Sequence, residues 1–285
     1  MDRRIILSAD STCDLGEELK KQYQVHFYPF HIILDGRDYQ DNVDIHPQDI
    51  YRVWREKKLL PKTAAINVAE YIDYFRKWVE EGYEVIHLNL GSALSSAHQN
   101  CVLAAQEVGG VYPVDACNLS TGIGLLVIKA AEMIEKGMAA GEISQQLKAM
   151  TGMVHASFIL DTLEFMRAGG HCSAVVAFGA NALGLKPCIE VQNQDGSMKV
   201  GKKYRGKLEK VLVNYVQDKL RQYDRIDDSR IFITHSGIEE TYIRLVKDAI
   251  GREAAFEQVY VTEASCTISS HCGPNTLGIL FMTEQ

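Results

Sequence analysis

The sequence predicts an α/β protein of two domains, with a mainly parallel sheet in the N-terminal domain. Short apolar runs alternate with helix-like segments through the first half of the chain, which is the order of βαβ units. Several of these runs end directly in Asp, Ser or Thr, as buried parallel strands do where they enter a polar loop. The length of 285 residues is about twice the ~150 residues of a typical domain, so we expect two domains.

The elements of the first half follow from its apolar periodicity and its turn residues. Strands are expected at residues 5–10, 25–33, 85–90 and 111–114, and Asp35-Gly36 marks a turn after the second. Helices are expected at residues 14–22, 47–58, 68–81, 119–136 and 143–153, with another opening after a loop at 91–96. The amphipathic helix at 68–81 stops at Gly82, a typical C-terminal glycine. Residues 59–65 are expected to be a loop.

The pattern changes near Val154, which predicts an N-terminal domain of residues 1–153 and a C-terminal domain of residues 154–285. The turn Asp195-Gly196 between two apolar runs predicts a β-hairpin. Strands of this second half are expected at 155–160, 185–190, 197–204, 230–234, 256–261 and 277–282, and helices at 162–167, 208–222 and 239–250. We therefore expect a smaller C-terminal domain of mixed α/β structure.

Composition and charge exclude several functional classes. With 30 Lys and Arg against 37 Asp and Glu, the net charge of −7 argues against a protein that mainly binds nucleic acid. No apolar run has the length of a signal peptide or a membrane span, so we expect a cytoplasmic protein with no integral membrane association. Seven cysteines without a Cys-x-x-Cys pair predict reduced thiols, and the nine histidines show no ligand spacing that would predict a metal site.

Polar residues gather in four segments that we expect to be loops at strand ends. These segments are residues 10–12, 62–64, 91–97 and 269–274. In open α/β sheets, ligands bind beyond the carboxyl ends of the strands, so such loops are the expected place for a site. Thr63 and Ser95 each have an alternative role as a helix N-cap. The two roles are compatible, because free amides at a helix start attract a carboxylate or phosphate.

A series of different short motifs runs along nearly the whole chain in a specific order and spacing. They are Ala9-Asp10-Ser11-Thr12-Cys13-Asp14-Leu15, Pro61-Lys62-Thr63, Leu94-Ser95, Asp115 with Gly122 and Gly124, Thr162-Leu163-Glu164-Phe165, Gly169-Gly170, Lys186-Pro187, Asp195-Gly196, and His271 with Gly273-Pro274 and Leu277-Gly278. Through these motifs the chain resembles the DegV family of bacterial fatty-acid-binding proteins, which includes the binding subunits of the fatty acid kinase system. The resemblance covers the chain almost from end to end.

This resemblance implies a DegV-like fold in which one long-chain fatty acid lies between the two domains. Thr63 and Ser95 would then hold the carboxylate, with His271 close by. Further residues that the resemblance places near the ligand are Ser92, Ser96, Gly170 and His171. The protein would be a carrier with no enzymatic activity and no cofactor apart from the bound fatty acid, and its partner would be an ATP-dependent fatty acid kinase that forms an acyl phosphate.

The chain departs from the family pattern around the expected headgroup. Ala64 stands where the family usually has Ser, and Ala97-His98 where it tends to have Thr-Tyr. His171 stands where Arg is common, which removes a permanent charge.

The densest basic run of the chain includes Arg205. Its members are Lys202, Lys203, Arg205, Lys207 and Lys210. A solvated face is the ordinary interpretation of such a run. The resemblance implies a role for Arg205 in docking the kinase, and a basic patch on an acidic protein suits that role.

Two other functions remain as alternatives. A serine hydrolase of a lipid ester would use Ser95 and His271 with Asp10 or Asp115, although the sequence lacks a Gly-x-Ser-x-Gly elbow. A nucleotide-binding domain would need a glycine-rich turn after residues 5–9, where the sequence has Asp-Ser-Thr instead. Apolar candidates for the wall of an acyl tunnel are Phe158, Leu160 and Phe178, for which core packing is the alternative.

Overall fold

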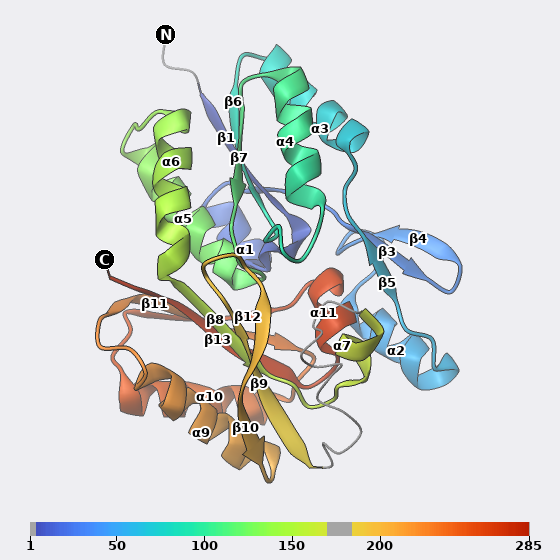
Figure 1. Cartoon of the computed structure of the whole chain (residues 1–285), viewed down its shortest axis with the longest axis vertical. Coiled ribbons are helices and arrows are strands. Elements are labelled where there is room, and N and C mark those ends of the chain that lie inside the picture. The colour runs from blue at the N-terminus through green and yellow to red at the C-terminus, as the bar shows by residue number, and fades with distance from the viewer. Residues whose placement is uncertain (1–3, 170–183, 285) are drawn as a thin grey trace.

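The computed structural model describes residues 4–169 and 184–284, and a parallel sheet forms the centre of its N-terminal half (Figure 1). Its strand order is β2-β1-β6-β7, and every neighbouring pair is parallel. The strands are β1 (Ile5–Asp10), β2 (His26–Tyr28), β6 (Glu84–Asn89) and β7 (Val111–Asp115). This arrangement confirms the α/β fold and the mainly parallel sheet predicted from the sequence.

Helices cover both faces of the parallel sheet. In Figure 1, α3 and α4 lie on one side of it and α5 and α6 on the other. The helices of this half are α1 (Gly16–Gln22), α2 (Pro47–Lys57), α3 (Val68–Glu80), α4 (Ala97–Val108), α5 (Thr121–Glu135) and α6 (Ala140–Met150). The start of α3 is fixed by a capping box, in which Asn67 and Glu70 exchange side-chain and backbone hydrogen bonds of 2.8 and 3.1 Å.

A small antiparallel sheet of order β4-β3-β5 protrudes beside the parallel sheet (Figure 1). Its strands are β3 (His31–Leu34), β4 (Arg37–Gln40) and β5 (Lys62–Ala64). The prediction of one strand at 25–33 is wrong, because Pro29 lacks an amide hydrogen and the chain leaves the parallel sheet there. The prediction of a loop at 59–65 is also wrong, since β5 is held by its pairing with β3 and is too short to show a period.

A six-stranded mixed sheet forms the second half, in the order β10-β9-β8-β13-β11-β12. Its strands are β8 (Val154–Ile159), β9 (Leu185–Val191), β10 (Met198–Arg205), β11 (Ile226–Ser236), β12 (Gln258–Glu263) and β13 (Thr276–Thr283). β9 and β10 form the predicted antiparallel hairpin, and β11 pairs with β12 in parallel. We propose residues 1–153 and 154–285 as the two domains, because the strands of this sheet begin at Val154.

Two layers of helices enclose the mixed sheet. α9 (Leu208–Leu220) and α10 (Glu240–Glu253) pack on its outer face, and α5 packs between this sheet and the parallel one, touching β1, β6, β8 and β13. This close packing needs glycine on α5, since a Cβ at Gly124 would lie 2.7 Å from Leu15 Cδ2. Within residues 4–169 and 184–284, no helix is long and apolar enough to cross a membrane.

Two short helices, α7 (Glu164–Gly169) and α11 (Cys266–Cys272), pack against each other below the small sheet. The prediction of a loop at 269–274 is wrong, because most of that segment belongs to α11. The helix is fixed by its surroundings: Ser265 caps the amide of Ile268, and Asp41, far away in the sequence, accepts the amides of Cys266 and Thr267. Such long-range anchors leave no periodic signal in the sequence.

Candidate functional site

A cavity of about 220 Å³ lies where the small sheet, α7 and α11 meet the edges of the two large sheets. Its polar side chains belong to Thr63, Ser95, Ser96, Thr267 and His271. The remaining lining residues are Phe30, Ala65, Leu90, Leu94, Leu119, Phe158, Met166, Met198, Ile268 and Cys272. The cavity therefore combines a few polar groups with a long apolar wall, which suits a ligand with one polar group and an apolar body.

Thr63 and His271 are in direct contact in the wall of this cavity. Thr63 Oγ1 lies 2.9 Å from His271 Nε2, and both side chains are half-buried. The pairing of β5 with β3, in which Thr63 lies opposite Ile32, fixes the backbone of Thr63. His271 lies in the last turn of α11. The predicted N-cap role of Thr63 is wrong, since it lies in a strand and Asn67 caps the next helix.

Ser95 lies on the loop between β6 and α4. Its Oγ accepts a hydrogen bond of 3.1 Å from the amide of Ala97, the first residue of α4. Ser95 thus helps to begin α4, as the N-cap interpretation expected, although the N-cap position itself is Ser96. Because Oγ acts as the acceptor in this bond, its own hydrogen can be donated to a ligand in the cavity.

Two buried carboxylates anchor the helix that carries His271. Asp41 accepts the amides of Cys266 and Thr267 at 2.8 and 3.2 Å and the Thr267 hydroxyl at 2.6 Å. Asp14 accepts the amide of Ser265 at 2.8 Å. Burial raises the pKa of Asp41, and it raises the pKa of Asp14 to about 7. The position of His271 therefore depends on two acidic side chains from the N-terminal half of the chain.

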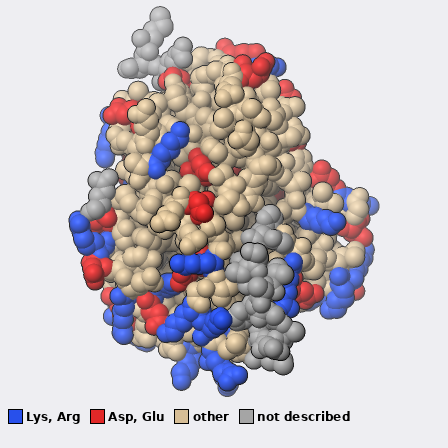
Figure 2. All heavy atoms as spheres, viewed as in Figure 1, with Lys and Arg blue, Asp and Glu red and all other residues tan. Residues whose placement is uncertain are grey.

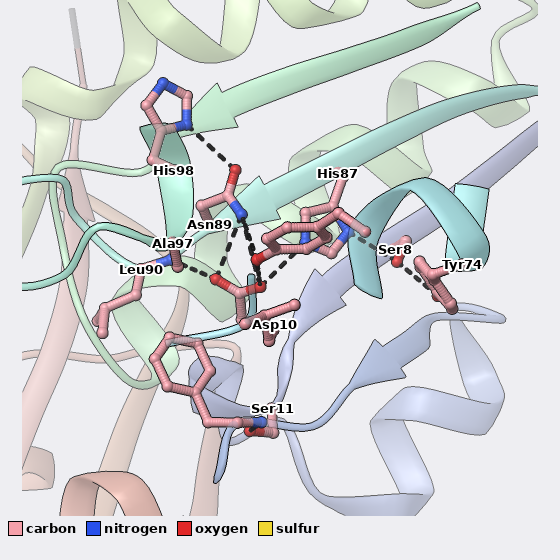
Figure 3. A network of polar contacts seen from close by, with 12 residues as sticks. Ser8, Asp10, Ser11, Tyr74, His87, Asn89, Leu90, Ala97 and His98 are labelled. Carbon is pink, nitrogen blue, oxygen red and sulfur yellow. Dashed lines mark hydrogen bonds and ion pairs between the residues drawn. The ribbon is translucent and has the colours of Figure 1, made fainter. Parts of the chain in front are cut away.

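A second buried network, drawn in Figure 3, holds the loop that carries Ser95. Its centre is Asp10, at the end of β1, which is inaccessible to solvent. Asp10 accepts hydrogen bonds from Tyr71 Oη at 2.6 Å, from Leu90 N at 2.9 Å and from the Asn89 amide group at 3.3 Å. Its carboxylate also lies 3.0 Å from His87 Nε2. The bond to Leu90 fixes the backbone just before the Ser95 loop.

The same network reaches the other end of that loop through His98. His98 Nδ1 lies 3.1 Å from Asn89 Oδ1, and burial lowers the pKa of His98 (Figure 3). The imidazole of His98 is thus directed into the protein rather than into the cavity. Together, Asp10 and Asn89 hold the Ser95 loop at both of its ends.

Gly169 packs directly against His271. A Cβ built on Gly169 would overlap His271 Nδ1. The glycine therefore leaves room for the imidazole in its present position beside Thr63.

The other residues named from the sequence are distributed around this cavity. Ser96 and Phe158 line it, while Ser92 is exposed on the loop, where its amide donates to Asp115. Leu160 is fully buried in the core. Arg205 is exposed at the end of β10. Gly170, His171 and Phe178 lie outside the described residues.

The residues that position the site, such as Asp41, His87 and Asn89, were not predicted from the sequence. Asp41 follows a turn in a polar stretch, and nothing in its neighbourhood distinguishes it from an exposed acid. His87 and Asn89 did carry a signal, since polar side chains at alternate positions of an otherwise buried strand indicate an internal hydrogen-bond network.

The geometry does not favour the hydrolase alternative. His271 Nε2 is engaged with Thr63, and Ser95 Oγ accepts from a backbone amide. The candidate acids belong to other contacts: Asp10 pairs with His87, and Asp115 accepts backbone amides beside its own strand. In the described part of the chain, no group of three or more His, Cys, Asp or Glu side chains has the arrangement of a metal site.

Comparisons with known proteins agree on one family. Residues 4–284 match the family model described as "Uncharacterised protein, DegV family". A DegV domain-containing protein of Caldanaerobacter subterraneus is 28% identical over 98% of both chains. A DegV family structure from Thermus thermophilus, described as binding fatty acid, has 29% identity and a TM-score of 0.88, covering 99% of this chain and 100% of that one. A DegV lipid-binding protein from Thermotoga maritima has 25% identity and a TM-score of 0.86 over 99% of both.

Proposed function

Because the chain belongs to the DegV family, whose model matches residues 4–284, we propose that it binds one long-chain fatty acid. Thr63 and Ser95 would hold the carboxylate with His271 close by, and the tail would lie along the apolar wall of the cavity. The observation that carries this proposal is that three polar residues from distant parts of the chain line a single, otherwise mostly apolar cavity. The similarity to the Thermus thermophilus fatty-acid-binding protein supports it.

The chemistry of the cavity suits a carboxylate. A buried carboxylate loses hydration worth several kcal/mol and needs several donors to replace it. If His271 donates its Nε2 hydrogen to Thr63 Oγ1, the Thr63 hydroxyl hydrogen is directed to the ligand, and Ser95 supplies a second hydroxyl. Each buried CH₂ of the tail then contributes about 0.8 kcal/mol.

The finer part of the proposal is that the bound carboxylate is presented to an ATP-dependent fatty acid kinase, in the cytoplasm where ATP is available. The sequence carries no phosphate-binding Gly-x-x-x-x-Gly-Lys-Ser/Thr motif, so phosphoryl transfer would belong to the partner and this chain would act as a carrier.

We place the docking surface for the kinase at the basic run around Arg205. Figure 2 shows Lys and Arg side chains gathered on the part of the surface where β10 and α9 lie. Lys202, Lys203 and Arg205 are all exposed there. β10 links this patch to the ligand site, because Met198 at its other end lines the cavity.

The binding proposal is tested on the purified protein. Native mass spectrometry and solvent extraction should show one bound fatty acid, and added palmitate or oleate should raise the melting temperature of stripped protein. Palmitate methyl ester, which lacks the charged headgroup, should raise it much less. The proposal fails if extraction yields no fatty acid and neither acid changes the melting temperature.

The kinase proposal has its own test. Arg205→Glu should lower the rate at which a bacterial fatty acid kinase phosphorylates the bound acid, without changing the fatty-acid dissociation constant. Arg244→Glu, an exposed change of the same kind on α10, is the matched control. Equal rates for the native protein and both variants would remove Arg205 from the docking surface.

A further inference from the structure

A second, much smaller cavity adjoins the first. Its volume is about 20 Å³. Four side chains line both cavities and therefore separate them: Leu119, Phe158, Ile268 and Cys272. Phe158 of β8 is the largest of the four, and it is only 5% exposed.

The small cavity lies beside a glycine in the middle of the mixed sheet. Gly278 of β13 pairs with Phe158 of β8 on one side and with Thr234 of β11 on the other. Paired residues point to the same face of a sheet, so the row has side chains at both flanks and none in the middle. A Cβ at Gly278 would lie 2.9 Å from Phe158 Cβ and 2.6 Å from the Ser157 carbonyl oxygen. Gly278 is therefore packed closely against β8, and only a residue without a side chain fits between Phe158 and Thr234 in this part of the cavity lining.

The hydroxyl groups around the small cavity already have partners elsewhere. The lining residues with hydroxyls are Ser120, Ser157, Thr234, Ser236 and Thr276. Ser120 bonds to the Asp14 carboxylate, Ser157 to the Tyr215 hydroxyl and Thr234 to the Thr121 hydroxyl. Ser236 bonds to the Ser269 hydroxyl, and Thr276 bonds to the Cys272 carbonyl oxygen. His235 also lines this cavity, and its Nδ1 has no hydrogen-bond partner among the described residues. An apolar group therefore enters the space without breaking a hydrogen bond.

The volume of the larger cavity brings Phe158 into the path of a long tail. An apolar cavity of about 150 Å³ holds the six carbons of benzene, so one of about 220 Å³ holds roughly nine. A fatty acid held by its carboxylate at Thr63, Ser95 and His271 would fill that space well before the end of a long chain. The remaining carbons then lie against the wall that Phe158 forms.

We propose that Phe158 determines the length of acyl chain that this protein accepts, as the side chain that separates the larger cavity from its extension beside Gly278. The proposal rests on the proposed fatty-acid function. A long tail displaces the Phe158 ring and places its methyl end in the small cavity, and a shorter tail leaves the ring in place.

The test compares dissociation constants for saturated fatty acids of increasing length. In the native protein, affinity should rise about fourfold for each added CH₂, the equivalent of about 0.8 kcal/mol, until the wall is reached, and then level off. Phe158→Ala and Phe158→Leu should both extend this rise by at least two carbons. Phe232→Leu makes the same change at a buried phenylalanine of the same sheet that lines neither cavity, and it should level off at the native length.

The possible outcomes separate the two proposals. If the native protein binds no fatty acid of any length, the proposed function fails. If it binds them and both Phe158 variants level off at the native length, or if Phe232→Leu extends the rise as far as they do, the role of Phe158 is overturned. Phe158→Leu is the smaller change, and circular dichroism confirms that each variant tested is folded.

Discussion

The hydroxyl of Thr63 and the Nε2 of His271 lie 2.9 Å apart although 208 positions separate the two residues in the chain. Thr63 is positioned by the pairing of β5 with β3, and His271 by α11, whose first amides bind Asp41. The contact therefore depends on three separate parts of the fold: the pairing of β5 with β3, the helix α11, and Asp41. A change in any of these three parts should therefore change the affinity for the ligand.

Removal of both hydroxyls should weaken fatty-acid binding. In the double variant Thr63→Ala/Ser95→Ala, a buried carboxylate would lose two donors, at a cost of at least about 2 kcal/mol, or roughly a 30-fold rise in Kd. The measurement is the Kd for palmitate by titration calorimetry. Ser92→Ala, an exposed change on the same loop, should leave the Kd unaltered. An unchanged Kd in the double variant would remove Thr63 and Ser95 from the headgroup site.

A methyl group at position 169 should act on the same site from the other side of His271. In Gly169→Ala the new Cβ would overlap His271 Nδ1, so the imidazole must leave its present position and its hydrogen bond with Thr63 is lost. We expect about a fivefold rise in Kd, the scale of one lost hydrogen bond of about 1 kcal/mol. Gly152→Ala is the control, because a Cβ there meets nothing within 4 Å. Native affinity in both variants would mean that the His271 position has no effect on binding.

Loss of the Asp10 carboxylate should destabilise the fold itself. Asp10→Ala would leave the Leu90 amide and the Tyr71 hydroxyl without their acceptor, and His87 Nε2 without its hydrogen-bond partner. We expect the free energy of unfolding in urea to fall by about 3–5 kcal/mol, the sum of such unsatisfied buried groups. Asp35→Ala, which removes an exposed ion pair with Lys57, should leave the free energy of unfolding close to that of the native protein, because solvent screens such a pair. Similar losses in the two variants would contradict a structural role for the Asp10 network.

Asp14 should make stability fall as pH rises toward neutrality. Its pKa is about 7 in the folded protein against an ordinary value of 3.8, so between these values the folded state holds a proton that the unfolded state lacks. The free energy of unfolding then decreases with rising pH, by a total on the order of 4 kcal/mol above pH 7. The free energy of unfolding of Asp14→Asn should not show this decrease, so it should rise relative to that of the native protein between pH 5 and 8. If the difference in free energy of unfolding between the native protein and Asp14→Asn stays constant with pH, Asp14 does not cause the pH dependence.

Much of the fold could be predicted because its signals are local. Parallel strands β1, β6 and β7 are apolar runs followed by polar residues, and helices such as α3 have both periodicity and caps. The small sheet and α11 could not be predicted, since β5 has three residues and α11 is fixed by Asp41 from 225 positions away. Thr63, Ser95 and His271 came from the family resemblance. The proposed role of Phe158 rests on its position opposite Gly278, which only the strand register reveals.

The central position of β13 has a consequence for the order of assembly. β13 lies between β8 and β11, yet it is made after every other strand of its sheet. During synthesis, the edges of β8 and β11 that face β13 therefore stay unpaired until β13 is made. Unpaired edges favour association with other chains. β13 follows directly after α11, so the wall of the cavity that α11 forms is made only shortly before the sheet can close. A ribosome-bound chain that stops before β13 should therefore neither retain lipid nor resist proteolysis in its second half.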